Sequence, residues 1–232
     1  MTQWPKVLPE IEPEQQAVID DAIKRWHENL PGTYRVIERF NHRYPLRSVP
    51  RAPKPFRTLE IGAGLGEQLA YEDLSRQDYT CVEMRAEMAR TIEERYASVT
   101  TIVGDCQQRL PLGDSTFDRA VAVHVLEHLP DLPSALDELR RLVRPGGALS
   151  VVIPCDPGFV YGIGRRFTAQ RDFERRYKMP YDVFIRREHI NSPPEILTLL
   201  RERFTITHRR FFPLRIPFVD LNVCLGITAT PR

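Results

Sequence analysis

A glycine-rich turn between a predicted strand and a predicted helix constrains this chain more than any other feature. It lies in the segment TLEIGAGLGEQLA, residues 58–70, where Thr58–Ile61 is a short apolar run and Glu67–Leu74 is compatible with a helix. Glycine adopts the backbone conformations of a tight turn at low cost, and the missing side chains let a ligand approach the backbone. Unpaired N–H groups at a helix start add hydrogen-bond donors. The turn therefore predicts a ligand site at the carboxyl end of a strand.

Strand and helix signals alternate downstream of this turn. The further strands predicted before residue 155 are Tyr79–Val82, Val99–Val103, Arg119–Val123 and Ala148–Ile153, and the helices are Ala86–Tyr96 and Leu132–Val143. Such alternation implies crossover connections and a parallel sheet covered on both faces, the doubly wound α/β class. A capping box at Ser192 then opens a helix through Leu200. Two strand-like runs, Phe204–Phe212 and Phe218–Thr228, close the chain.

The length of 232 residues is typical of one large domain. Residues 1–56 are predicted to form a helical extension or cap, whose stretch Pro45–Pro55 is an irregular connector. The main domain is predicted to span residues 57–232. It contains an insertion at residues 155–190, after the fifth strand, that lacks a clean helical or strand period.

Charge and cysteine content exclude several classes of protein. The net charge of +2 gives no general attraction to nucleic acid. The four cysteines lie too far apart for a zinc or redox motif, and free thiols suit a reducing cytoplasm. The polar N-terminus does not resemble a signal peptide, and no apolar run approaches the roughly 20 residues of a membrane span. We therefore expect a cytoplasmic protein without a transmembrane segment.

The glycine spacing separates this turn from a dinucleotide-binding turn. The pattern is Gly62-x-Gly64-x-Gly66, and Glu67 stands where the dinucleotide fingerprint would place its third glycine. An acidic residue, Glu60, lies within the strand just before the turn. These details favour a nucleoside-containing cofactor other than a nicotinamide dinucleotide.

Two further strand ends carry residues suited to a nucleoside. Glu83 ends the second predicted strand and can accept hydrogen bonds from both ribose hydroxyls, a role common to both classes of cofactor. Gly104-Asp105-Cys106 follows the third predicted strand, where it can meet an adenine ring.

Taken together, these residues resemble the class I S-adenosylmethionine-dependent methyltransferases, in their subgroup of small-molecule enzymes. The resemblance covers about residues 57–153. It is carried by the segments TLEIGAGLGEQLA, CVEM, GDCQQRLPLGDSTFD, VHVLEHL and LRRLVRPGG. It implies a Rossmann-like sheet of seven strands, mostly parallel with the last antiparallel. It also implies S-adenosylmethionine as cofactor and S-adenosylhomocysteine as product.

In this family the glycine turn lies under the methionine part of the cofactor. The acid ending the second strand binds the ribose, and the Asp after the third strand meets the adenine amino group. The cofactor-binding residues expected from the turn and the resemblance are Glu60, Gly62, Gly64, Gly66, Glu83, Met84, Asp105, Cys106 and His124.

The resemblance implies methyl transfer to a small molecule, and we favour a hydroxyl acceptor. A carbon acceptor, as in quinone biosynthesis, is the alternative within the class. A nicotinamide-dependent oxidoreductase and an inactive cofactor-binding module are alternatives of other classes. The motif after strand four in enzymes that methylate nucleic-acid bases is missing, so we expect no nucleic-acid partner. Glu127 alone does not supply a cluster of acidic ligands, so we expect no metal. A homodimer is compatible with the sequence.

Catalysis of O-methylation needs a general base near the acceptor. The leading candidates are His124, just past the fourth strand, and His189, just before the capped helix. His128, Tyr161 and Asp156 are further candidates near the expected cleft. Packing roles stay open for the histidines, and a structural role is favoured for His128 and Glu127. The insertion at residues 155–190 combines arginines with aromatic residues. It is either a lid over an anionic acceptor or a solvated helical face.

Overall fold

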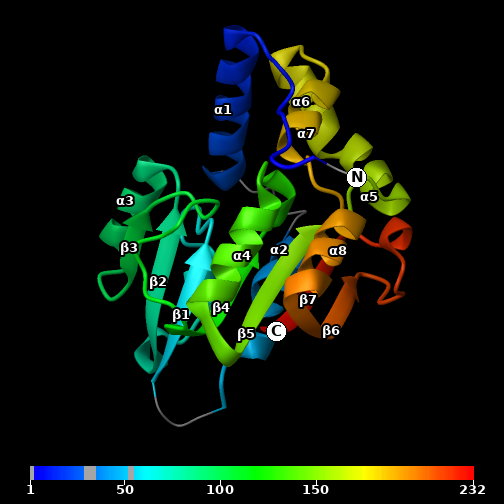
Figure 1. Cartoon of the computed structure of the whole chain (residues 1–232). Helices are drawn as coiled ribbons and strands as arrows, with labels where there is room; N and C mark the ends of the chain where they lie inside the picture. The colour runs from blue at the N-terminus through cyan, green and yellow to red at the C-terminus, as the bar shows by residue number, and fades with distance from the viewer. Residues whose placement is uncertain (1–2, 29–34, 52–54) are drawn as a thin grey trace.

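A seven-stranded sheet forms the centre of the molecule, in the order β3-β2-β1-β4-β5-β7-β6 (Figure 1). The computed structural model describes residues 3–28, 35–51 and 55–232. The strands are β1 Phe56–Ile61, β2 Gln77–Glu83, β3 Thr100–Val103, β4 Phe117–Val123, β5 Val143–Pro154, β6 Phe204–Phe212 and β7 Cys224–Pro231. Neighbours from β3 to β5 pair in parallel, whereas β7 runs antiparallel to β5 and β6. The predicted doubly wound, Rossmann-like class with an antiparallel last strand is confirmed.

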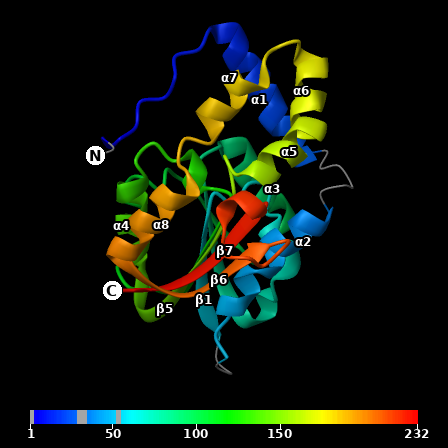
Figure 2. The same cartoon turned by 90° about the vertical axis from the view of Figure 1, so that its right-hand side faces the viewer.

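Helices cover both faces of this sheet (Figure 2). On one face lie α4, Leu132–Leu142, and α8, Pro193–Arg203; on the other lie α3, Ala86–Arg95, and α2, Arg35–Arg43. Helix α4 buries Leu132, Leu136 and Leu139, whose spacing places them on one side of a helix. The predicted capping box opens α8, where the Glu195 carboxylate accepts from the Ser192 amide and from the Ser192 hydroxyl. Because the winding reverses between β1 and β4, the carboxyl ends of these strands form the switch point where ligands bind.

Two predicted elements are wrong. Residues 67–74 form no α-helix but the 3-10 turns η3, Gln68–Tyr71, and η4, Leu74–Arg76. The glycine turn takes up the first five residues of the β1–β2 crossover, residues 62–76, and leaves ten for the return to β2. The last strand begins at Cys224, not at Phe218. The segment before it folds around the buried Asn222 side chain, which accepts from the Leu214 amide and donates to the Ile216 and Phe218 carbonyls.

The N-terminal extension has two parts with different places in the fold. Helix α1, Pro13–Glu28, lies above the carboxyl ends of the strands (Figure 1), whereas α2 and the 3-10 turn η2, Pro45–Ser48, pack on the sheet. Tyr44 is buried between them, and its hydroxyl contacts His208 and Thr228. Pro45–Ser48, predicted as part of an irregular connector, thus form a 3-10 turn that packs on the sheet. Residues 1–2, 29–34 and 52–54 of the predicted extension lie outside the described residues.

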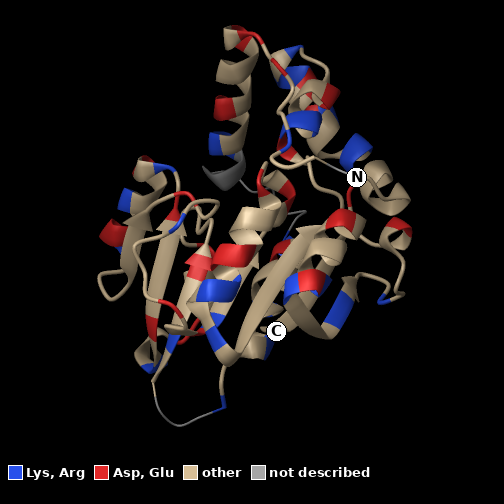
Figure 3. Cartoon of the chain, viewed as in Figure 1, with Lys and Arg blue, Asp and Glu red and all other residues tan. Residues whose placement is uncertain are grey.

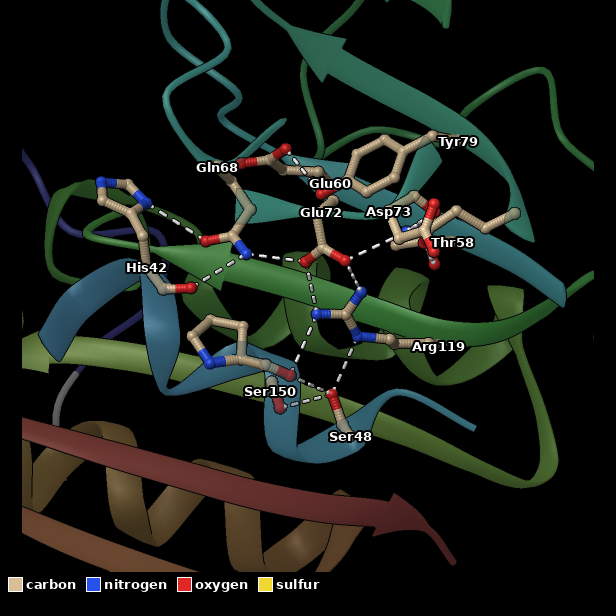
Figure 4. Close-up of polar contacts among 12 residues, drawn as sticks. His42, Ser48, Thr58, Glu60, Gln68, Glu72, Asp73, Tyr79, Arg119 and Ser150 are labelled. Atoms are coloured by element: carbon tan, nitrogen blue, oxygen red, sulfur yellow. Dashed lines mark hydrogen bonds and ion pairs between the residues drawn. The ribbon is translucent and has the colours of Figure 1, made fainter. Parts of the chain in front are cut away.

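A buried polar network joins η2 and the β1–β2 crossover to the sheet (Figure 4). Arg119 on β4 donates to the Glu72 carboxylate at 2.8 and 3.0 Å, and both side chains are fully buried. The same guanidinium donates to the Ser48 hydroxyl and the Pro45 carbonyl in η2. These bonds fix η2 and the first crossover to the middle of the sheet.

The insertion consists of three short helices above the carboxyl ends of the strands. They are α5 Phe159–Phe167, α6 Ala169–Tyr177 and α7 Tyr181–Glu188. Phe173, Tyr181 and Ile185 form a small core with Val18 and Ala22 of α1, and the Tyr177 hydroxyl donates to Asp21. The insertion and α1 therefore form one helical layer (Figures 1 and 2). Among the residues that the structure describes, no helix has the length and apolar character needed to cross a membrane.

Replacing Gly226 with alanine is expected to destabilise the protein by about 1–3 kcal/mol, because the chain is tightly packed there. A Cβ at Gly226 on β7 would lie 2.5 Å from the Tyr44 ring. Gly162 in α5 is the control, since a Cβ there meets nothing within 4 Å and alanine favours a helix. Chemical denaturation measures both variants. Equal stabilities of the two would contradict the predicted contact.

Candidate active site

The glycine turn has the geometry that the sequence predicts. Gly62, Gly64 and Gly66 have φ angles of 62°, 58° and 83°, a region that side chains disfavour. A Cβ on Gly62 would also lie 2.5 Å from Cγ2 of Val125. The Gly62 amide donates to the Val82 carbonyl at 2.8 Å. The turn is therefore held against both β2 and the loop that follows β4.

Glu83 lies at the carboxyl end of β2, directly beside this turn. One carboxylate oxygen accepts from the Gly64 amide at 3.0 Å and the other from the Arg85 amide at 2.9 Å. Each oxygen of a carboxylate has room for a second hydrogen bond. Glu83 can therefore accept two hydroxyl donors without giving up its contacts to the turn. This arrangement fits the ribose of S-adenosylmethionine.

Residues suited to an adenine ring flank Glu83. The apolar side chain of Met84 is 61% exposed, although it follows a buried strand. Asp105 uses Oδ1 to accept from Gln107, while its Oδ2 has no hydrogen-bond partner among the described residues. Cys106 is buried next to it, and burial, with the charge of Asp105, raises the pKa of its thiol. These residues fit a ring with an exocyclic amine.

Glu60 has a different environment from the one expected. Its carboxyl is buried, and it accepts from the Tyr79 hydroxyl at 2.9 Å, with the Cys81 thiol nearby (Figure 4). These partners lie on the neighbouring strand, inside the layer that α3 covers. Glu60 thus makes contacts within the protein, and its contact with the cofactor stays a prediction.

A substitution at Glu60 is expected to change the pH dependence of stability. Burial, only partly offset by the Tyr79 bond, raises the pKa of Glu60 from 4.5 to about 8. The folded state therefore holds a proton that the unfolded state releases, and stability falls as the pH rises between these values. Glu60→Gln keeps the acceptor for Tyr79 and does not titrate. We expect the variant to match the wild type at pH 4.5 and to exceed it by about 1–3 kcal/mol at pH 8. Thermal unfolding at both pH values measures this, and an equal loss at both would refute it.

His124 follows β4 in a left-handed backbone conformation, with a φ of 53°. Such strain in a residue other than glycine is often found at functional sites. Nδ1 lies 3.0 Å from Oε1 of Glu127. Burial alone would lower the pKa of His124, but its hydrogen bonds with Cys224 and Glu127 raise it to about 10. These hydrogen bonds favour the protonated imidazole as a donor, and the role of His124 as a general base stays a prediction.

His189 ends α7 and belongs to a chain of polar contacts. Its Nδ1 lies 2.9 Å from Oδ2 of Asp156, whose Oδ1 accepts from Arg165 at 3.1 Å. A neutral imidazole that donates from Nδ1 has a lone pair on Nε2. The Asp156 contact therefore orients His189 as an acceptor, which agrees with its predicted placement at the site.

The segment after His189 is fastened to the loop after β4. The amides of Ile190 and Asn191 both donate to the Glu127 carbonyl, at 2.9 and 3.1 Å. The buried Asn191 side chain donates to the carbonyls of Leu126 and Leu129. Two segments far apart in sequence are thus brought together at the carboxyl end of β4.

Glu127 and His128 complete this cluster, and sequence reasoning gave them structural roles. His128 Nδ1 lies 2.6 Å from the Glu188 carbonyl, and its ring is 5.3 Å from that of His189. The useful signal was the spacing His124-x-x-Glu127-His128 directly after a buried strand. Nothing local in the sequence places His189 and Asp156 beside it.

A doubly wound sheet with a glycine turn, a ribose-type acid and a polar cluster at the switch point defines a Rossmann-like methyltransferase fold. A methyltransferase from Thermotoga maritima, described as a possible histamine N-methyltransferase, has this fold with a TM-score of 0.61 and 23% identity. The match covers 91% of this chain and 99% of that one.

Residues 59–151 match the family described as a methyltransferase domain. The chain is 32% identical to malonyl-[acyl-carrier protein] O-methyltransferase of Pectobacterium atrosepticum, over 42% of this chain and 38% of that protein. It is 29% identical to demethylmenaquinone methyltransferase of Desulfitobacterium hafniense, over 45% of this chain and 42% of that protein. The matched region thus covers about two fifths of the length of each of these relatives. Residues 59–151 thus match a methyltransferase domain, a class of domain whose cofactor is S-adenosylmethionine.

Proposed function

We propose that this protein transfers the methyl group of S-adenosylmethionine to a hydroxyl oxygen of a small molecule. The observation that carries the proposal is the position of the polar cluster. Val125 packs against the glycine turn. His124 and Glu127 lie before and after Val125 in the same loop. The cofactor-binding edge and the polar cluster therefore adjoin at the switch point.

The cofactor supplies an activated methyl group on a sulfonium. The acceptor oxygen forms a bond to the methyl carbon while the carbon–sulfur bond breaks, and the electron pair stays on sulfur. What the protein adds is in-line placement, exclusion of water and removal of the acceptor's proton. The Asp156–His189 pair directs an imidazole lone pair that suits the last of these tasks. The helical layer of α1 and α5–α7 is proposed as the cover of the site.

Methylation of a carbon atom, as in quinone biosynthesis, is the second candidate. The similarity to a demethylmenaquinone methyltransferase favours it. Activated carbon acceptors need less help from a base, so the two candidates differ in their dependence on His189.

An anionic acceptor receives limited support from the arginines of the insertion. Lys/Arg and Asp/Glu alternate along α6 and α7 (Figure 3), and Arg175 and Arg186 pair with acids on exposed surfaces. These two belong to a solvated face. Arg165 differs, because its guanidinium contacts Asp156 in the polar cluster and lies over the Tyr181 ring.

The test is transfer of a labelled methyl group to a panel of acceptors. The panel contains a malonyl thioester, a phenol and a demethylated naphthoquinol, with release of S-adenosylhomocysteine as the readout. We expect an oxygen acceptor to react, and His189→Gln to lower kcat by about 10²–10⁴-fold. Transfer to carbon alone, unaffected by His189→Gln, would favour the second candidate.

A further inference from the structure

We propose that Glu127, His128 and His189 form a binding site for one divalent first-row transition-metal ion. One possible ligand atom from each of these side chains lies within 4.8 Å of those from the other two. Two imidazoles and a carboxylate are a common set of protein ligands for such ions. The residues come from the loop after β4 and from the end of α7, at the carboxyl edge of the sheet.

Both histidines are oriented as metal ligands would be. His128 Nδ1 lies 2.6 Å from the Glu188 carbonyl, and His189 Nδ1 lies 2.9 Å from the Asp156 carboxylate. Ligating histidines usually donate their second ring nitrogen to a carbonyl or carboxylate, which fixes the tautomer and the ring orientation. In each case Nε2 is left with a lone pair for an ion.

Glu127 supplies an observation that is independent of these distances. Its side chain is 1% exposed, and Oε1 is bonded to His124. Oε2 is buried and has no hydrogen-bond partner among the described residues. An unpaired buried carboxylate oxygen is costly, so such atoms usually have a partner. A cation coordinated by Glu127 and the two histidines would provide that partner.

The cluster is also held rigidly. Asn191 ties the segment that carries His189 to the carbonyls of Leu126 and Leu129, on either side of Glu127 and His128. The amide of Ile190 donates to the Glu127 carbonyl. A site built on fixed ligands loses little entropy when the ion binds.

The ligand set selects among ions and leaves a coordination position open. Imidazole nitrogens favour zinc, copper, iron or nickel over calcium, magnesium and manganese, which prefer oxygen ligands. Three protein ligands leave room for water or for the acceptor oxygen. With the ion bound, Nε2 of His189 is a ligand and no longer acts as the base. The ion would instead lower the pKa of an acceptor hydroxyl, whose proton passes to water before the oxygen attacks the methyl carbon. This role rests on the proposed methyl transfer, whereas the binding of the ion does not. It revises the expectation of no metal, which considered acidic ligands alone.

Titration of chelator-treated protein with Co²⁺ and Zn²⁺ tests the site. Calorimetry should show one ion bound per chain, and Co²⁺ should give visible absorption bands of a nitrogen- and oxygen-ligated ion. Glu127→Gln and His189→Gln are expected to weaken binding at least 100-fold. Asp156→Asn, which weakens the support of His189 and the ion pair with Arg165 but removes no proposed ligand, is expected to weaken binding about 10–100-fold. Circular dichroism confirms that each variant is folded.

His208→Gln is the matched control, because this half-buried histidine contacts Tyr44 far from the cluster. We expect it to bind the ion like the wild type. Failure of the wild type to bind either ion, or equal binding by the wild type and Glu127→Gln, overturns the proposal. The same samples are also titrated with S-adenosylhomocysteine. Binding of this compound without binding of an ion would overturn the metal site and leave the proposed methyl transfer standing.

Discussion

Replacing Arg119 with methionine is expected to destabilise the protein by about 3–5 kcal/mol, because it leaves a buried carboxylate without its cation. Both Arg119 and Glu72 have fully buried side chains, with 2.8 Å between Nη2 and Oε1. Burial raises the pKa of Glu72, but the bonds to Arg119 outweigh this and hold the pKa below its usual value. Without Arg119, Glu72 must take up a proton or draw in water. Either change disturbs Ser48 and Pro45 as well.

Chemical denaturation measures this effect against two controls. The double variant Arg119→Met, Glu72→Gln removes the unpaired charge and should regain part of the lost stability. Arg175→Met breaks an ion pair whose side chains are 69% and 64% exposed, so we expect a change within about 0.5 kcal/mol. A loss for Arg119→Met as small as that for Arg175→Met would show that the network contributes little.

Replacing Glu83 with alanine is expected to weaken the binding of S-adenosylmethionine by about 1–3 kcal/mol, or roughly 5–150-fold. The variant loses the proposed charge-assisted bonds to the ribose hydroxyls. It also frees the amide of Gly64 in the glycine turn. Both effects act on the same ligand and in the same direction.

Glu87→Ala is the matched control, because Glu87 lies in the first turn of α3, close in sequence but on an exposed surface. Calorimetric titration with S-adenosylmethionine compares the two variants, and thermal unfolding shows whether each is folded. An affinity of Glu83→Ala equal to that of Glu87→Ala would show that the ribose assignment is wrong.

The parts of the fold that local sequence patterns specify were predicted well. The central strands are continuous apolar runs, so they were found with small errors at their ends. The helix after β4 was found from the spacing of Leu132, Leu136 and Leu139, which the structure buries. The glycine turn was found because positive φ angles at three alternate positions favour glycine. Each of these signals acts over a few residues.

The parts that depend on contacts between distant segments were not predicted. Arg119 was included in an apolar strand, and its partners Glu72 and Ser48 lie in the crossover and in the N-terminal extension. The buried bond from the Tyr79 hydroxyl to Glu60 joins two neighbouring strands and was not predicted. His189 meets His128 only because Asn191 fastens the end of the insertion to the loop after β4. Such pairings follow from topology, which a single sequence does not display.

The most direct test of the account is calorimetric titration of the wild-type protein with S-adenosylmethionine, S-adenosylhomocysteine and NAD. The glycine turn, Glu83 and Asp105 predict micromolar binding of the first two and no binding of NAD. Binding of NAD without binding of either sulfur compound would contradict the assignment of the cofactor, and with it the proposed methyl transfer.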